Sequence, residues 1–234
     1  MICRVRMVAL AVAAFCVLPA ALATAGVENT VHNLSISGPG DIKAVNEQEV
    51  CIFCHTTHNT KGQGALWNRE LSEAQYKIYK SGTLRKNGAP QPDGASKLCL
   101  SCHDGTIALG KVLSRGENIA LRNIGGRGEI PQGRRSNLGT DLSGMHPLSV
   151  AYGKDDELEH DHDGSGSGAS KKVGVETSLV ASALIPKDFL DKQRKVQCTT
   201  CHDPHEDRFS ALGGAPRFWR RSTVSEVCEA CHIW

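Results

Sequence analysis

The sequence predicts a mostly irregular fold with short α-helices and little β-sheet. Aromatic residues make up only 5% of the 234 residues, which is thin for a core built from side chains alone. The 24 glycines and 9 prolines also interrupt regular structure along much of the chain. The third observation is that eight of the 10 cysteines fall in four copies of one short pattern. That pattern indicates where the missing apolar core comes from.

The repeated pattern is C-x-x-C-H. Two thiols at this spacing can add to the two vinyl groups of one haem, while the next residue, histidine, reaches the iron from the same side. The sequence therefore predicts four covalent c-type haems, whose large apolar rings form the core for the surrounding coil and short helices. The attachment residues are Cys51, Cys54, Cys99, Cys102, Cys198, Cys201, Cys228 and Cys231, and the proximal iron ligands are His55, His103, His202 and His232.

Zinc ribbons and redox-active dithiols are the alternatives for paired C-x-x-C motifs. Neither requires a histidine after the second cysteine. The chain has only 10 histidines, yet one follows each of the four pairs, so haem attachment is favoured. The two remaining cysteines, Cys3 and Cys16, lie near the N-terminus, so no cysteine of the later chain remains for a structural disulfide.

Residues 1–25 have the three parts of a secretory signal peptide. Arg4 and Arg6 precede an apolar run over 7–22, and the small-residue site 23–25 follows. We expect an exported protein, periplasmic or extracellular; an uncleaved anchor, or a lipoprotein through Cys16, is the alternative. The formal charge of +2 comes from the two arginines, so the mature chain is balanced and predicts no nucleic-acid partner.

The rest of the chain divides into two dihaem halves. The N-terminal half spans 26–152, a flexible acidic and Gly/Ser-rich loop or linker spans 153–172, and the C-terminal half spans 173–234. Ser72, Gln75 and Gly82 predict a helix over 72–80. We expect a second helix from Pro186 through Val196 and a last one beginning near Ser222 or Thr223. Residues 104–140 are rich in Gly, Arg and Asn and predict a loop, with room for one short helix.

An internal repeat indicates the distal iron ligands. Each half has an upstream histidine in an H-x-L-S context, then C-x-x-C-H-x-x-H, then a further C-x-x-C-H. Four six-coordinate irons need four distal ligands. The spare histidines in matching places supply that number, although their spacing does not say which serves which iron; they are His32, His58, His146 and His205.

The other possible ligands fit less well. His160 and His162 lie in the acidic run and indicate a solvated loop, with a weak surface metal site as the alternative. Met145 is the one methionine beyond the signal peptide and neighbours His146, the better candidate. At most one haem would then be His/Met, and we predict four low-potential bis-histidine haems.

These residues give a resemblance to a known family. With its four C-x-x-C-H motifs and two H-x-L-S segments, the chain resembles the multihaem (tetrahaem) c-type cytochromes of the doubled CxxCH class found in metal-respiring bacteria. The resemblance implies a periplasmic or extracellular electron carrier with closely spaced haems. Its partners would be other redox proteins or cytochromes and a soluble or insoluble terminal acceptor. Some relatives polymerise into filaments, so self-association through His32 is a further hypothesis.

Enough histidines to close every iron predict an electron carrier without catalytic residues. The alternative is a multihaem reductase of the nitrite or hydroxylamine type, which needs one open iron with polar groups beside it. The candidates for that role lie in a Gly-rich loop and are Arg127, Arg134 and Arg135. The alternative is that they are solvated charges of the loop with no role in binding. A cytochrome subunit of a membrane-associated complex is the third possibility, with the same haem chemistry.

Overall fold

A computed structural model describes residues 26–58, 60, 64–81, 90–151, 189–210 and 217–232. The predicted signal peptide over 1–25, the predicted linker over 153–172, and His160 and His162 lie outside the described residues. All four C-x-x-C-H motifs and all four spare histidines lie within them.

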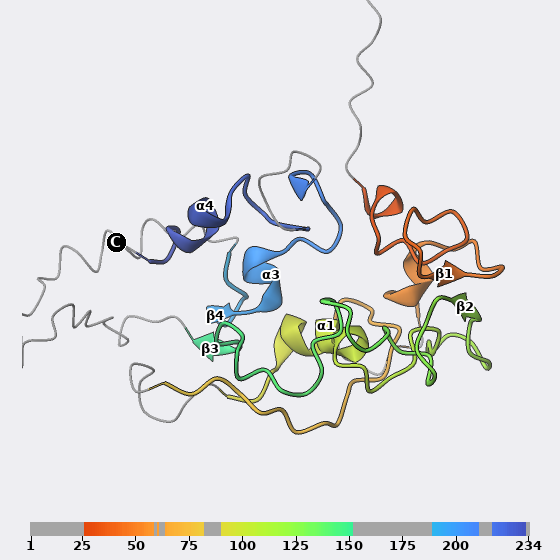
Figure 1. Cartoon of the computed structure of the whole chain (residues 1–234), viewed down its shortest axis with the longest axis horizontal. Helices are drawn as coiled ribbons and strands as arrows, with labels where there is room; N and C mark the ends of the chain where they lie inside the picture. The colour runs from red at the N-terminus through yellow and green to blue at the C-terminus, as the bar shows by residue number, and fades with distance from the viewer. Residues whose placement is uncertain are drawn as a thin grey trace, which may run out of the picture.

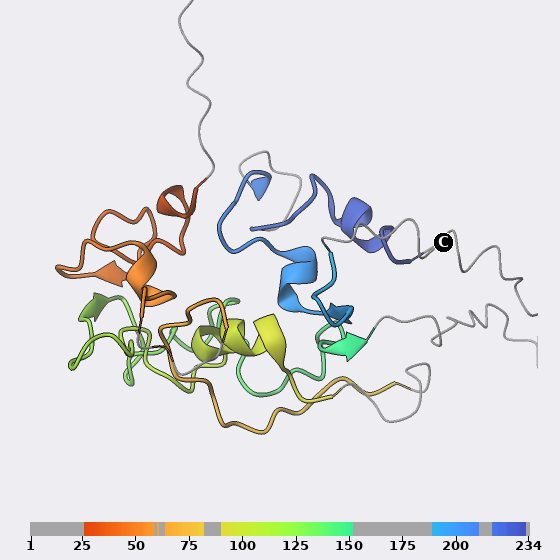
Figure 2. The same cartoon turned by 180° about the vertical axis from the view of Figure 1, so that it is seen from behind.

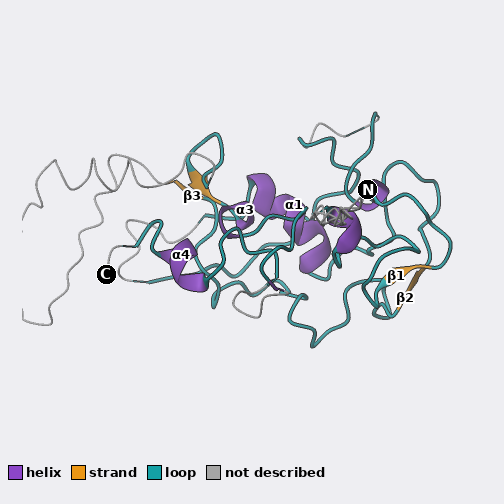
Figure 3. Ribbon diagram, turned by 90° about the horizontal axis from the view of Figure 1, so that it is seen from above, coloured by secondary structure: helices purple, strands orange, loops and turns teal. Residues whose placement is uncertain are grey.

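The described residues consist mainly of coil and turns joined by short elements (Figures 1 and 3). The longest element among the described residues is α1, with 10 residues. No helix in the described part of the chain is long and apolar enough to cross a membrane. The elements are η1 (Val27–Asn29), β1 (Lys43–Ala44), η2 (Cys51–Phe53), α1 (Gly94–His103), β2 (Leu121–Arg122), β3 (Val150–Ala151), β4 (Lys195–Val196), α3 (Cys198–Cys201) and α4 (Val224–Cys228).

Two small antiparallel strand pairs hold distant parts of the chain together. β1 pairs with β2, with Lys43 opposite Arg122, and β3 pairs with β4, with Val150 opposite Val196. The second pair joins the two halves, since β3 ends the first half and β4 immediately precedes the third haem motif. Figure 1 shows this pair beside α3, at the opposite side of α1 from β1 and β2.

The two halves meet where α1 packs against α3 (Figure 2). The buried Gln197 side chain, which is 1% exposed, lies at this junction. It accepts hydrogen bonds from Ser96 and donates to Asp93 and Asp191. Gly94 begins α1 with a φ of +47, and a Cβ there would lie 2.9 Å from Gln197 Nε2. A glycine at this position therefore permits the close approach of the two halves.

The N-terminal half has two apolar clusters of its own. The smaller cluster contains Tyr76, Leu100 and Leu142. Arg69 is fully buried and donates hydrogen bonds to the carbonyls of Leu109 and Ser101, which ties the loop after the second motif to α1. The larger cluster comprises Ala44, Ile52, Phe53, Leu109, Leu121 and Ile130.

The predicted helix over 72–80 is wrong. Residues 71–76 and 78–80 are coil, and Lys77 forms an isolated parallel bridge with Asp141. Ser72 does not cap a helix, since its hydroxyl accepts from the Ala74 amide in a local turn. The backbone of Tyr76 instead hydrogen-bonds the Gln91 side chain in both directions. Burial of Tyr76 against Leu100 and Leu142 thus outweighs the local helix signals.

The two later helix predictions have different outcomes. The predicted helix from Pro186 through Val196 is wrong over the described part, where residues 189–194 form turns and β4 follows. The end of this segment, Lys195–Val196, pairs with β3 and is therefore extended, not helical. The last helix is confirmed: Thr223 caps α4 and exchanges capping-box hydrogen bonds with Glu226.

Candidate haem-binding site

Short helices present the attachment residues. In α1, Cys99, Cys102 and His103 are three and four positions apart, so they share one helix face. α3 consists of the third motif itself, from Cys198 to Cys201. The first motif begins as the 3₁₀ turn η2, and α4 ends at Cys228 of the fourth. The second motif therefore directs its two thiols and its histidine toward one side of α1.

The structure brings three of the four spare histidines to C-x-x-C-H histidines. His32 faces His103 with ring centres 6.1 Å apart. His205 faces His55 at 6.1 Å, and His146 faces His232 at 6.2 Å. No three His, Cys, Asp or Glu side chains within the described ranges converge as they would around a single metal ion. The histidines meet in pairs instead.

The separation within each pair fits one haem iron. A metal–imidazole bond is about 2 Å long and the ring centre lies about 1 Å beyond the nitrogen, so two imidazoles on one iron have centres roughly 6 Å apart. All three pairs match this distance, and each consists of one motif histidine and one histidine from elsewhere. The residues present therefore fit bis-histidine haem ligation.

Hydrogen bonds also orient these rings. A backbone carbonyl can only accept, so a ring Nδ1 that faces one must donate, which leaves the Nε2 lone pair free for iron. Five histidines have this arrangement, with Nδ1 to oxygen distances of 2.6–3.2 Å: His32 to Pro204, His55 to Ala65, His103 to Ser136, His146 to Pro147 and His202 to Arg217.

Burial keeps two of the rings neutral. It lowers the pKa of His32 from its usual 6.5 to about 4. It also lowers the pKa of His103, against an opposing backbone hydrogen bond to Ser136. A neutral imidazole is the form that binds iron, so a lowered histidine pKa favours ligation.

His58 and His202 are not brought together. His58 is exposed, and no ring contact among the described residues joins it to another histidine. His202 stacks on Trp219 with ring centres 5.1 Å apart. Of the four predicted distal ligands, three lie beside a motif histidine: His32, His146 and His205. The role of His58 stays a prediction.

The attachment thiols adjoin one another in motif order. Burial raises the pKa of Cys54 to about 12 and that of Cys201 to about 11, whereas the Cys99 contact lowers the pKa of Cys198 to about 7. Neighbouring motifs share contacts: Cys54 and Cys102 pack on one apolar cluster, Cys99 hydrogen-bonds Cys198, and Cys201 lies within electrostatic reach of Cys228 and Cys231.

A pocket adjoins the third motif. Its lining combines three aromatic and three arginine side chains with two carboxylates: Phe189, Phe209, Trp219, Arg208, Arg220, Arg221, Asp203 and Glu206. The indole Nε1 of Trp219 is buried and lacks a hydrogen-bond acceptor within the described structure. Arg208 pairs with Glu206, and Arg220 and Arg221 lie over the Phe189 ring, so the aromatic side chains and the buried indole donor are the features that suit a porphyrin edge. Sequence reasoning missed Trp67 and Trp219, because their spacings from His55 and His202 differ and hide their equivalence.

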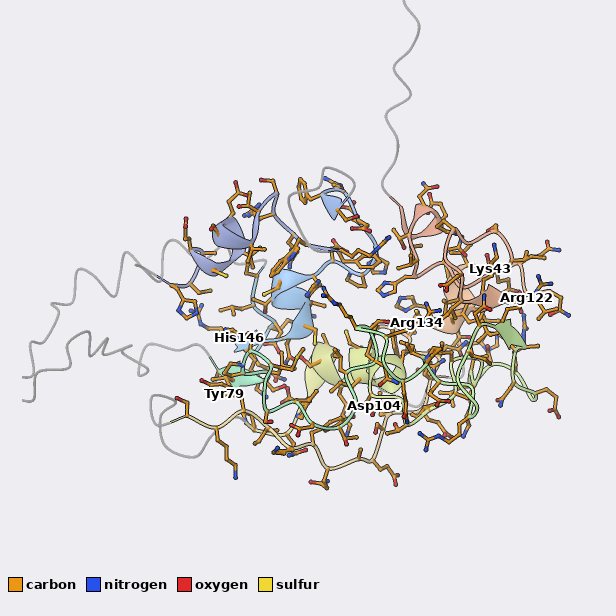
Figure 4. The ribbon with its side chains drawn as sticks, viewed as in Figure 1. Lys43, Tyr79, Asp104, Arg122, Arg134 and His146 are labelled. Carbon is orange, nitrogen blue, oxygen red and sulfur yellow. The ribbon has the colours of Figure 1, made fainter. Side chains whose placement is uncertain are left out.

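Two of the three arginines considered for a reductase, Arg134 and Arg127, lie beside carboxylates. Arg134 makes a bidentate ion pair with Asp41, which lowers the pKa of that carboxyl to about 2. Arg127 lies 4.0 Å from Glu129 and is largely exposed. Figure 4 shows Arg134 well apart from His146, which lies beside β3. Met145 is exposed, and it is its neighbour His146 that faces His232.

Comparison with known proteins agrees with this site. The family described as "Doubled CXXCH motif" matches residues 192–234, which contain the third and fourth motifs. No curated protein matches the chain. The family match supports a multihaem c-type cytochrome with covalently bound haem iron and a role in electron transport.

Proposed function

We propose that this chain is an exported tetrahaem c-type cytochrome that acts as an electron carrier in the periplasm or at the cell surface. It would take electrons from one redox protein and pass them to another, or to a soluble or insoluble terminal acceptor. The single observation that carries the proposal is the pairing of three motif histidines with three outside histidines at ring separations of 6.1–6.2 Å. Irons closed on both sides transfer electrons but leave no position for a substrate.

The haems, when bound, supply the one-electron iron couple, and the protein's own residues determine its setting. The carbonyls that accept from the ring Nδ1 atoms keep each imidazole oriented and strengthen it as a ligand. Two neutral histidines per iron favour a lower potential than histidine with methionine. The order of the thiol contacts supports a haem sequence that follows the four motifs from first to fourth.

The proposal does not require a ligand from a neighbouring subunit. His32, the residue considered for filament formation, has a partner in its own chain, His103. Its Nδ1 also donates to Pro204 O, so the ring is held from within the molecule. The three histidine pairs of the described residues therefore form within one chain, and none of them needs a second subunit.

The test is low-temperature EPR of the air-oxidised mature protein, with haem quantified on the same sample. We expect four haems per chain and only low-spin ferric signals. A high-spin signal that shifts when nitrite or cyanide is added would contradict the carrier and favour the reductase. Fewer than four covalent haems by mass spectrometry would contradict the tetrahaem assignment itself.

A further inference from the structure

The two halves share a local frame around the first and third motifs. His55 forms an isolated antiparallel bridge with Trp67, and His202 forms the same bridge with Trp219. The Asn68 amide donates to Cys54 O at 2.9 Å, and the Arg220 amide donates to Cys201 O at 3.0 Å. In both frames the motif histidine also donates from Nδ1 to a carbonyl just before the tryptophan. The sequence repeat is thus a structural repeat.

The second and fourth motifs follow the same rule in both halves. His103 is paired with His32, the upstream H-x-L-S histidine of the first half. His232 is paired with His146, the upstream H-x-L-S histidine of the second half. Each of these irons would therefore take its distal ligand from its own half.

The first motif departs from that rule. Its His55 faces His205, which follows the third motif and belongs to the other half. The adjacent Pro204 carbonyl accepts from His32. A single turn of the C-terminal half, residues 203–205, therefore contributes to the sites of both the first and the second motif.

The contact between His55 and His205 also brings the two C-x-x-C-H-x-x-H segments, 51–58 and 198–205, together. The histidine that ends the first segment is therefore the available candidate for the third motif. That residue is His58, and it is also the one predicted distal ligand without a histidine partner in the described structure, while His202 is the one motif histidine without one. The halves are not otherwise equivalent here, since His146 donates to Pro147 O and not to the turn after the first motif.

We infer that the first and third haem sites exchange distal ligands between the halves: His205 ligates the iron bound by His55, and His58 ligates the iron bound by His202. This inference rests on the proposed tetrahaem function. It makes the halves interdependent, because each would complete one iron site in the other. The second and fourth sites would remain complete within their own halves.

The first experiment counts open irons by carbon monoxide binding to the dithionite-reduced holoprotein. Wild type and the control His162→Ala should bind none. His205→Ala and His58→Ala should each bind one carbon monoxide per chain while retaining four covalent haems, and imidazole should restore the low-spin spectrum. If either variant binds no carbon monoxide while keeping its haems, that histidine is not a ligand and the exchange is overturned.

The second experiment identifies which iron is opened. In a Cys51→Ala/Cys54→Ala background, which lacks the first haem, adding His205→Ala should open no further iron, whereas adding His58→Ala should open one. In the mirror background Cys198→Ala/Cys201→Ala, which lacks the third haem, adding His58→Ala should open no further iron, whereas adding His205→Ala should open one. This background replaces the first one if the first does not mature. An additional open iron from His205→Ala in the first background, or from His58→Ala in the mirror, would overturn the exchange.

EPR provides a readout that needs no haem deletion. The His55 and His205 planes lie 18° apart, whereas the His32/His103 and His146/His232 planes lie 65° and 73° apart. Nearly parallel imidazoles give a rhombic low-spin ferric spectrum, and nearly perpendicular ones a strongly anisotropic spectrum. His205→Ala should remove a rhombic component; loss of an anisotropic component instead would overturn the assignment. Four wild-type haems with an unexpected variant pattern would refute only the exchange, whereas fewer than four would refute the proposed function.

Discussion

Residues 26–151 gather five buried apolar residues around Phe53, and a second cluster forms around Leu100. The described part of the C-terminal half buries Phe189, Phe218 and Val227, but these three do not form such a cluster there. Both halves nevertheless present the same haem-binding pattern. The difference teaches that one ligand set can be held in two ways, by a side-chain core in the first half and by contacts with that half in the second. On the proposed function, bound haem would complete the core of the second half.

The largest expected effect comes from removing haem altogether. In protein produced without haem attachment, we expect the backbone amides of 189–210 and 217–232 to lose nearly all protection from hydrogen exchange, because their apolar core is incomplete. Amides of 43–54 and 96–130 should keep part of theirs, since Phe53 and its neighbours remain packed. Hydrogen exchange with mass spectrometry measures both regions in one sample. Equal loss in the two halves would contradict the comparison.

The next effect tests the first half's own core. Phe53→Ala should lower the free energy of unfolding of the holoprotein by about 3–5 kcal/mol, because it leaves a cavity at the centre of the larger cluster. Guanidinium unfolding followed by circular dichroism measures the change. Leu66→Ala, at a side chain that is 55% exposed, is the control and should cost under about 1 kcal/mol. A similar cost for both variants would show that haem, and not this cluster, holds the first half.

A smaller effect is expected at the junction of the halves. Gln197→Ala would leave Ser96, Asp93 and Asp191 without their buried amide partner. We expect a loss of about 1–3 kcal/mol and faster exchange in β4 and α3 than in β1 and β2. Gln193→Ala, in the exposed turn before β4, is the matched control. If both variants unfold alike, the amide does not couple the halves.

The smallest effect concerns Tyr76, whose hydroxyl donates to the buried Asp104 at 2.7 Å. Tyr76→Phe should cost about 1–2 kcal/mol at neutral pH. Burial, with the Asp104 contact, raises the pKa of Tyr76 from 10.0 to about 12, so the folded state holds this proton more tightly than the unfolded state. This contribution is present in full below pH 10 and is lost as the pH rises toward about 12.

Unfolding measured at successive alkaline pH values tests the Tyr76 contribution. The wild type should lose stability over that window more steeply than Tyr76→Phe. Tyr79→Phe provides a control tyrosine that lies well apart from Asp104 (Figure 4), and it should follow the wild-type pH dependence. If the free energy of unfolding depended on pH in the same way for wild type and Tyr76→Phe, Tyr76 would not be the source of the alkaline loss of stability.

Local chemistry could be predicted from the sequence because it is contained within a few residues. C-x-x-C-H carries both thiols and the proximal histidine in five positions, so no long-range information is needed to predict haem attachment. The capping box of Thr223 and Glu226 is equally local, and the helix it predicts is present. Over 72–80 the same local reasoning was wrong, because the cost of losing a short helix is small beside burial of Tyr76.

The partnership of the histidines is decided only by the tertiary structure. The repeat predicted four distal candidates, but His32 and His103, or His55 and His205, meet only after long loops close. Spacing along the chain does not encode which loop closes on which motif. Packing of α1 on α3, with Gln197 between them, brings the turn over 203–205 to the first half. The sequence alone therefore predicted what each motif binds, and the packing of the two halves decided which histidine faces it.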